Sequence, residues 1–293
     1  MQLRIDNAPY GVEVRTPLLY GRVPGQPVWQ GGLWLDLLLP VPAPLEPAPA
    51  VVYLHHGGWR QGDRSYGGYP WNGPILAAHG FVVASVSYRF TSVAPFPAQL
   101  HDVKAAVRWL RANADHYGID HDRIGALGDS AGGHLAALLG TTGDRPDLEG
   151  DCGSPGRSSR VQAVVARCAP YDFRTFSPRD PGISAVLDAL FGGSASERAA
   201  LRELASPRAH VTPESAPFLI IHGTLDETVP VEQARAMAGT LRDGGVPVTL
   251  HELEGVFHNL RPETDVPWGT EPWTELAALS LACFRSMAGQ AAS

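Results

Sequence analysis

The stretch GALGDSAGGHLAALL, residues 125–139, decides the fold of this chain. It contains the pattern G-x-S-x-G around Ser130, with a β-rich run before it and a run of Ala and Leu after it. In a nucleophile elbow, a serine occupies a strained turn between a strand and a helix, and its Oγ stands above the sheet. Flanking glycines let neighbouring backbone pass close to that turn. The stretch therefore predicts a strand over 123–127, a turn at Ser130 and a helix over 131–140.

The rest of the chain alternates between strand-like and helix-like runs. Strands are expected over 34–40, 50–58, 80–89, 161–167, 217–223 and 246–255, and helices over 98–112, 183–191, 231–245 and 271–289. This alternation predicts βαβ crossovers, a mostly parallel sheet and helices on both of its faces. The proline-rich run 40–50 is expected to be a loop, and 143–160 and 174–216 are expected to be insertions above the sheet.

Composition and charge exclude several classes of partner. The chain has 293 residues, of which 44% are hydrophobic and 18% charged, which is typical of a globular protein. The net charge is −7, Lys104 is the single lysine, and the arginines are scattered. Nucleic acid and anionic membranes are therefore poor candidate partners. No run approaches the roughly 20 apolar residues that span a bilayer, and the first residues do not resemble a signal peptide, so a cytoplasmic location is expected.

The cysteines and histidines do not form a metal-binding pattern. Cys152, Cys168 and Cys283 are an odd number, so thiols are favoured over a disulfide, although a Cys152–Cys168 bridge stays open. None of the three has a metal-ligand spacing, and the pair His55–His56 lacks a second pair of ligands. We expect neither a metal nor a cofactor. The sequence leaves open whether the protein is a monomer or a homodimer.

A serine hydroxyl needs a base and an acid to become a nucleophile, and in an elbow fold these follow it in the order acid, then histidine. Asp226 follows the strand expected at 217–223, and His258 follows the next expected strand. Both loops should leave the same sheet edge as Ser130. Glu227 is the rival of Asp226 for the acid. Among the eleven histidines, His258 fits the position and the chain order, whereas His134 is expected to pack beneath the elbow.

Backbone N–H groups are expected to stabilise the oxyanion that forms during acyl transfer. One donor should be Ala131, which directly follows the nucleophile. The others should lie in a glycine-rich turn after an early strand, and YLHHGGWRQGD at 53–63 supplies Gly57 and Gly58 there.

Taken together, these motifs resemble the α/β-hydrolase superfamily, specifically carboxylesterases related to bimodular feruloyl esterases and, more distantly, to hormone-sensitive lipase. The likeness covers residues 28–285 and rests on HHGGWRQGD, GFVVASVSYRF, FPAQLHDVKAAVRWLRANADHYGID, RIGALGDSAGGHLAALL, HGTLDETVP and GVFHNL. It implies one α/β-hydrolase domain over 1–293, with a mostly parallel central sheet, helices on both faces and a small lid within 174–216.

The resemblance also implies the roles of the site residues. Ser130, Asp226 and His258 would be the nucleophile, acid and base, and Gly57, Gly58 and Ala131 would be the oxyanion donors. Two departures from the family pattern stand out. His56 replaces the first glycine of the usual H-G-G-G-W, which leaves the conformation of that loop open, and Asn259-Leu260 replaces the usual Gly-Phe after the histidine.

The predicted function is hydrolysis of short-chain or aryl (feruloyl-type) carboxylic esters through an acyl-enzyme, on a small-molecule substrate. Trp59, Tyr171 and Phe257 are the first candidates for the substrate pocket. Further aromatic candidates are Tyr66, Tyr69, Trp71, Phe173 and Phe176. Two alternatives stay open: an amide hydrolase with the same triad, of the arylformamidase or peptidase-like kind, and a non-catalytic ligand-binding protein on the same fold.

Overall fold

The computed structural model describes residues 2–3, 8–68, 72–143, 145–176, 178, 181–260 and 273–289. Tyr69 and Trp71, two of the aromatic pocket candidates, lie outside these residues. The described strands form one sheet in the order β1-β2-β3-β5-β4-β6-β7-β8-β9. The strands are β1 Gln2–Leu3, β2 Gly11–Arg22, β3 Gly32–Val41, β4 Ala48–Leu54, β5 Val82–Val86, β6 Ile119–Asp129, β7 Ala163–Arg167, β8 Phe218–Gly223 and β9 Val248–Leu253.

The sheet is mostly parallel, as predicted. Antiparallel pairing is confined to β1 with β2, β2 with β3 and β3 with β5 among the described strands. From β5 through β4 to β9, every neighbouring pair is parallel. The carboxyl ends of β4, β6, β7, β8 and β9 therefore meet at one edge, where ligands bind in open α/β sheets.

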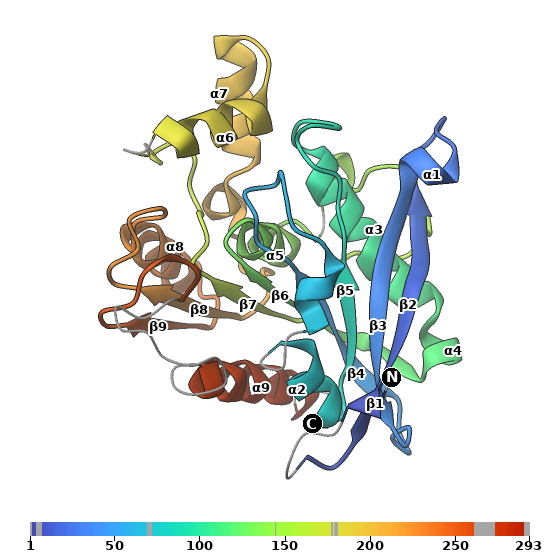
Figure 1. Cartoon of the computed structure of the whole chain (residues 1–293). Helices are drawn as coiled ribbons and strands as arrows, with labels where there is room; N and C mark the ends of the chain where they lie inside the picture. Colours follow the sequence, from blue (N-terminus) through green and yellow to red (C-terminus); the bar gives the residue numbers. More distant parts are fainter. Residues whose placement is uncertain are drawn as a thin grey trace.

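The helices cover both faces of the sheet. They are α1 Val28–Gly31, α2 Gly73–Ala78, α3 Ala98–Ala112, α4 Ala114–Tyr117, α5 Ala131–Thr141, α6 Pro181–Phe191, α7 Ala195–Leu204, α8 Glu232–Asp243 and α9 Trp273–Gly289, with 3₁₀ turns η1 Arg64–Gly68, η2 Pro146–Leu148, η3 Pro207–His210 and η4 His258–Leu260. Helices α2 and α9 contact one face, and α3, α5 and α8 contact the other. Helices α6 and α7 stand apart from both layers, at the top of Figure 1.

The central strands are apolar along their whole length because both of their sides are buried. In β4, Val52 and Leu54 belong to the core beneath α3 and α5, whereas Val51 and Tyr53 belong to the core beneath α2 and α9. Parallel strands covered on both faces have this continuous apolar pattern.

Cys152 and Cys168, the two cysteines for which a bridge was left open, are both free and buried thiols.

Most predicted elements match the structure, with several differences. Helix α2 was not assigned from the sequence, and the loop predicted over 40–50 is shorter, because β3 runs to Val41 and β4 begins at Ala48. The helix at 98–112 is confirmed at both ends. The strand predicted over 50–58 is too long, because β4 ends at Leu54 and the chain turns at Gly57, whose φ is 120°. The long strand β2 was not assigned from the sequence, and the insertion 174–216 holds two helices, α6 and α7, where one was expected.

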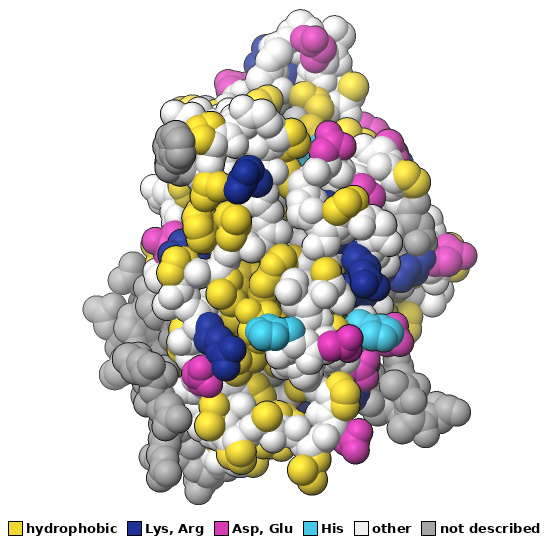
Figure 2. Space-filling view, turned by 90° about the vertical axis from the view of Figure 1, so that its right-hand side faces the viewer, with side chains coloured by type: hydrophobic (Ala, Val, Ile, Leu, Met, Phe, Trp, Pro, Cys, Tyr) yellow, Lys and Arg dark blue, Asp and Glu magenta, His cyan; other side chains and the backbone are white. Residues whose placement is uncertain are grey.

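The surface that faces right in Figure 1 has mixed charge. In Figure 2, Lys and Arg side chains on this face are scattered among acidic and apolar side chains and do not merge into a large basic area. No helix in the described part of the chain is both long and apolar enough to cross a membrane.

Candidate functional site

The three residues predicted to form a triad come together at the carboxyl edge of the sheet. Ser130 follows β6, Asp226 follows β8, and His258 opens the turn η4 after β9. The Ser130 Oγ lies 3.0 Å from Nε2 of His258, and Nδ1 of the same ring lies 2.8 Å from Oδ2 of Asp226. Because a carboxylate can only accept, Nδ1 carries the proton and Nε2 is left to accept from the serine hydroxyl. The arrangement can remove a proton from Ser130.

Ser130 occupies the strained turn that the sequence predicts. Its φ is 52° and its ψ is −115°, in a region that L-residues rarely adopt. The Ser130 N–H donates to the Arg167 carbonyl at 2.8 Å, which ties the turn to the end of β7. Close backbone approach explains the glycines on either side. A Cβ at Gly128 would overlap the backbone of Gly132, and a Cβ at Gly132 would overlap the Leu54 carbonyl oxygen at the end of β4.

We expect Gly132→Ala to destabilise the protein by about 1–3 kcal/mol, because the added methyl group meets backbone that has no room to move. Gly239→Ala on α8 is the matched control, since a Cβ there has nothing within 4 Å. Removing a glycine from a helix interior should leave the control unchanged or up to about 1 kcal/mol more stable. Urea unfolding of both variants measures the two effects. Equal stabilities would contradict the close approach at Gly132.

Asp226 is held by four hydrogen-bond donors. The backbone N–H groups of Thr228 and Val229 donate to its Oδ1 at 3.0 and 2.8 Å, and His258 donates to Oδ2. His222 Nε2 lies 3.2 Å from the same Oδ2 and 2.8 Å from the Val229 carbonyl oxygen. Burial raises the pKa of Asp226, but the hydrogen bonds from both histidines and from Val229 outweigh it and lower this pKa to about 2. The carboxylate is therefore charged at neutral and at mildly acidic pH.

This depressed pKa makes a testable contribution to stability. A carboxyl group with a folded-state pKa of about 2 and a usual value of 3.8 stabilises the native state above pH 4, and it loses this contribution as the pH falls toward 2. We expect the difference in unfolding free energy between wild type and Asp226→Asn to shrink by about 2 kcal/mol between pH 5 and pH 2. Urea unfolding at several pH values measures it. A difference that stays constant with pH would contradict the depressed pKa.

A buried polar network supports the elbow from below. Arg167 on β7 pairs with Asp129, the residue before Ser130, with Nε 2.6 Å from Oδ1. The Arg167 Nη2 donates to Asn72 Oδ1 at 2.6 Å, and Asn72 Nδ2 donates to the Tyr53 hydroxyl at 3.1 Å. Tyr53 in turn donates to Asp129 at 2.9 Å. Burial and the nearby Asp129 raise the pKa of Tyr53, which keeps its hydroxyl a neutral donor. The network joins the ends of β4, β6 and β7 directly beneath Ser130.

Arg167→Met should destabilise the protein by about 3–5 kcal/mol, because it leaves the Asp129 carboxylate without its counter-charge in a largely buried place. A second change, Asp129→Leu in the same chain, should recover part of this loss, since it removes the uncompensated charge. Chemical denaturation of both variants provides the test. If Arg167→Met were as stable as the wild type, the pair of Arg167 with Asp129 would contribute no stability.

The glycine-rich loop after β4, which the sequence predicts to supply oxyanion donors, turns through three residues in left-handed backbone conformations. Gly57, Gly58 and Trp59 have φ values of 120°, 60° and 56°. His55 braces the loop from beneath, since its Nδ1–H donates to the His56 carbonyl at 2.7 Å and its ring stacks on Tyr88 at 4.3 Å. The described residues with positive φ do not include His56, so a side chain is tolerated where the family usually has glycine.

The first N–H groups of a helix have no partner within that helix, so the Ala131 N–H at the start of α5 is available as a donor. The structure brings Gly57 and Gly58 into one cavity with Ser130 and His258. This cavity has a volume of about 190 Å³. It is also lined by Ile183, Val186 and Leu187 of α6.

The predicted pocket residues divide between the cavity and the core. Trp59 and Phe176 line the cavity. Tyr171 does not, because it is fully buried and its hydroxyl donates to the Ala166 carbonyl at 3.4 Å. Phe257 is not among the lining residues either, and 38% of its surface is exposed. Neither Tyr171 nor Phe257 is therefore part of the lining of this cavity.

The remaining aromatic candidates and His134 brace the loop and the elbow rather than line the cavity. Tyr66 packs against His56 with 4.7 Å between ring centroids. Phe173 is buried against Trp59 and His134. His134 is buried beneath the elbow, as predicted, and its Nε2–H donates to the Ala205 carbonyl at 2.7 Å, after the end of α7. Burial lowers the pKa of His134 to about 4, so it stays neutral.

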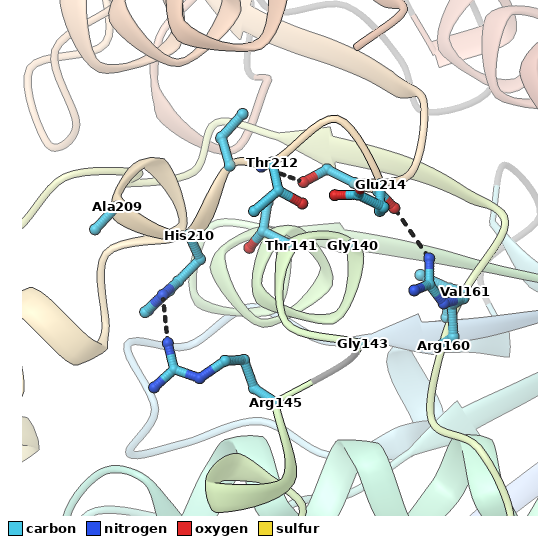
Figure 3. A pocket seen from close by; sticks show the side chains of 12 residues that line it. Gly140, Thr141, Gly143, Arg145, Arg160, Val161, Ala209, His210, Thr212 and Glu214 are labelled. Carbon is cyan, nitrogen blue, oxygen red and sulfur yellow. Dashed lines mark hydrogen bonds between the residues drawn. The ribbon is translucent and has the colours of Figure 1, made fainter. Parts of the chain in front are cut away.

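A second cavity, of about 210 Å³, lies at the carboxyl end of α5, the opposite end of that helix from Ser130. Figure 3 shows its two arginines engaged with neighbouring groups. Arg145 Nη1 lies 3.4 Å from His210 Nδ1, and Arg160 donates to the Glu214 carbonyl oxygen at 3.0 Å. It therefore plays no part in chemistry at Ser130. Among the described residues, no group of three or more metal-ligating side chains is close enough to hold a metal ion.

The mostly parallel sheet with helices on both faces, and the serine elbow at the end of β6, define an α/β-hydrolase fold. The model of the BD-FAE family matches residues 35–241, and the chain belongs to this family. It is 35% identical to "Esterase LipC" of Mycobacterium tuberculosis, covering 78% of this chain and 55% of that protein. It is 31% identical to "Esterase LipQ" of the same organism, covering 74% and 51%. The chain thus spans about half the length of the curated relatives it matches.

Solved structures share the fold over almost the whole chain. "Truncated form of carbohydrate esterase from gut microbiota" superposes with a TM-score of 0.78 at 26% identity, covering 96% of this chain and 98% of that one. "Thermogutta terrifontis esterase 2 phosphonylated by sarin" superposes with a TM-score of 0.76 at 25% identity, covering 95% and 94%.

Proposed function

We propose that the protein is a serine carboxylic ester hydrolase. One observation carries this proposal: the hydrogen-bonded series from Ser130 through His258 to Asp226 opens into a cavity beside a loop of backbone donors. The family and the esterase names of the matched relatives support the same activity. In this proposal the chain works as one domain.

The proposed reaction has two halves. His258 Nε2 takes the proton of Ser130 as Oγ attacks the ester carbonyl carbon, and the resulting imidazolium is stabilised by Asp226. The carbonyl oxygen becomes an oxyanion, which accepts hydrogen bonds from the N–H groups of Gly57, Gly58 and Ala131. The alcohol leaves with the proton that His258 returns. Water then attacks the acyl-enzyme by the same route and releases the acid and free Ser130.

The proposed substrates are esters with a short acyl or aryl group, including feruloyl-type esters. A cavity of about 190 Å³ is small, and Trp59, Phe176 and Val186 give it apolar walls. A related solved structure, the Thermogutta terrifontis esterase "Est2-Propionate bound", has a short-chain acid in its name. In this proposal α6 and α7 form the lid over the cavity, since α6 supplies one wall and its Phe191 packs against Phe173.

A hydrolysis profile tests the proposal. The panel is p-nitrophenyl acetate through decanoate, methyl ferulate and an aryl amide, each at several concentrations. We expect the highest kcat/KM on short acyl or aryl esters and a much lower value on the amide. Faster hydrolysis of the amide would favour an amide hydrolase. Failure on all substrates would contradict catalysis and favour a ligand-binding role.

A further inference from the structure

The two walls of the Ser130 cavity differ in chemistry. The wall supplied by α6 is apolar and consists of Ile183, Val186 and Leu187. A second part of the lining, here called the polar wall, comes from a single loop, residues 56–61, and includes the polar residues His56, Arg60 and Gln61 beside the apolar Trp59. A site with one apolar and one polar wall orients a ligand by matching its two ends. This feature belongs to this chain's own loop sequence, HHGGWRQ, rather than to the triad.

Arg60 is the charged member of the polar wall. It is exposed, and within the described residues it forms no ion pair. Some other arginines are paired, such as Arg64 with Asp36 and Arg235 with Glu252, but the exposed Arg242 has no ion pair among the described residues either. Arg60 differs from Arg242 in that it lines the Ser130 cavity. The chain has a net charge of −7, so a cation at the rim of this cavity is not part of a general positive surface. The geometry of the Arg60 guanidinium matches that of a carboxylate, which an arginine can bind with two parallel hydrogen bonds.

The neighbouring polar side chains add donors without adding negative charge. His56 is partly buried and held in place by Tyr66, with 4.7 Å between ring centroids. Gln61 contributes an amide, which donates through its NH₂ group. The acidic residue nearest in sequence, Asp63, accepts a hydrogen bond from the Ser65 backbone N–H at 2.7 Å. The residues of the polar wall therefore contribute hydrogen-bond donors and one positive charge to the lining of the cavity.

From this wall we propose that the preferred substrates are esters that carry a carboxylate in addition to the ester group, with Arg60 binding the carboxylate and His56 and Gln61 lining its site. The inference rests on the proposed ester hydrolysis at Ser130. The apolar wall then receives the uncharged end of the substrate. The carboxylate can belong to the acyl part, as in a dicarboxylic half-ester, or to the alcohol part, as in an acylated hydroxy acid.

Two matched pairs of substrates test the proposal and distinguish these cases. Monoethyl glutarate and ethyl valerate differ by a carboxylate on the acyl side, and 4-acetoxybenzoate and 4-acetoxybenzamide differ by one on the alcohol side. A hydrogen-bonded charge pair predicts that kcat/KM favours the carboxylate member of one pair about tenfold or more. The preference should weaken as salt is added, because Arg60 is exposed.

The variant Arg60→Gln should reduce this preference to about twofold or less, mainly through a higher KM for the carboxylate ester. Arg242→Gln, at an exposed arginine on α8 away from the cavity, is the control and should keep the preference. Equal kcat/KM values within both pairs, or a preference that survives Arg60→Gln, would overturn the carboxylate site while leaving ester hydrolysis intact. No hydrolysis of any of the four esters would overturn the proposed function, and this site with it.

Discussion

Replacing Ser130 with alanine is expected to lower kcat for ester hydrolysis by a factor on the order of 10⁶. The variant loses the Oγ that lies 3.0 Å from His258 Nε2, and no acyl-enzyme can form. Residual turnover should come from direct attack of water on an ester whose carbonyl oxygen is hydrogen-bonded by the donor loop. The fold should persist, because the Ser130 backbone N–H still donates to Arg167. Initial rates on p-nitrophenyl acetate, with a circular dichroism melt of each protein, give the comparison.

A serine elsewhere controls for the substitution itself. Ser158→Ala, at an exposed position in the loop before β7, should keep wild-type kcat and KM. If Ser130→Ala and Ser158→Ala both retained more than a few per cent of the wild-type kcat, the nucleophile would have to be a residue other than Ser130.

Replacing Asp226 with asparagine should lower kcat by a factor of about 10⁴. Asparagine at this place offers an amide NH₂ to the histidine, which favours the tautomer with the proton on Nε2, so the ring can no longer accept from Ser130. It also removes the negative charge that stabilises the imidazolium. The measurement is kcat and KM on p-nitrophenyl acetate across pH 6–9.

Glu227→Gln is the control, because Glu227 is the neighbouring acid that sequence alone left as the rival of Asp226. Asp226 is buried and lies 2.8 Å from His258, whereas Glu227 is exposed. We expect Glu227→Gln to keep near wild-type kcat. A large loss of kcat in Glu227→Gln together with a small loss of kcat in Asp226→Asn would show that Glu227 is the acid of the triad.

The fold was predictable because its signals are local. The run of β-branched residues, the glycines around Ser130 and the 3.6-residue period at 98–112 each specify an element from its own residues. The glycine pattern also carried information about packing, since Gly132 is needed where the elbow passes the Leu54 carbonyl of β4. Chain order then placed Asp226 and His258 at the same sheet edge as Ser130. The positions of Asp226 and His258 at this edge follow from the order of strands and helices along the chain.

The supporting residues were not predictable, because their roles depend on neighbours that are distant in sequence. The sequence indicates only that Arg167 is a polar residue at the end of a strand. Its pairing with Asp129 becomes evident only when β6 and β7 lie side by side. His222 reads as a strand residue, and its contact with Asp226 depends on how the loop after β8 folds back. Tyr171 and Phe257 were assigned to the pocket by loop position, but side-chain direction placed one in the core and one at the surface.

Helix α7 was missed although its sequence contains a signal. Ser194 and Glu197 form a capping box, in which the Ser194 side chain accepts from the Glu197 N–H and the Glu197 side chain accepts from the Ser194 N–H. This S-x-x-E spacing predicts a helix start. The helix that follows has no buried residue, and the capping box marks where it begins.

The most direct test of the central claim, that Ser130 is an activated nucleophile, is covalent labelling with a fluorophosphonate followed by mass spectrometry of the digested protein. The proposed mechanism predicts one phosphonyl adduct, on the peptide that contains Ser130, which forms rapidly in the wild type. It further predicts no adduct there in Ser130→Ala and slow labelling in His258→Ala, because the hydroxyl is then not activated. An adduct on a different residue, or a wild-type protein that does not react, would contradict the claim.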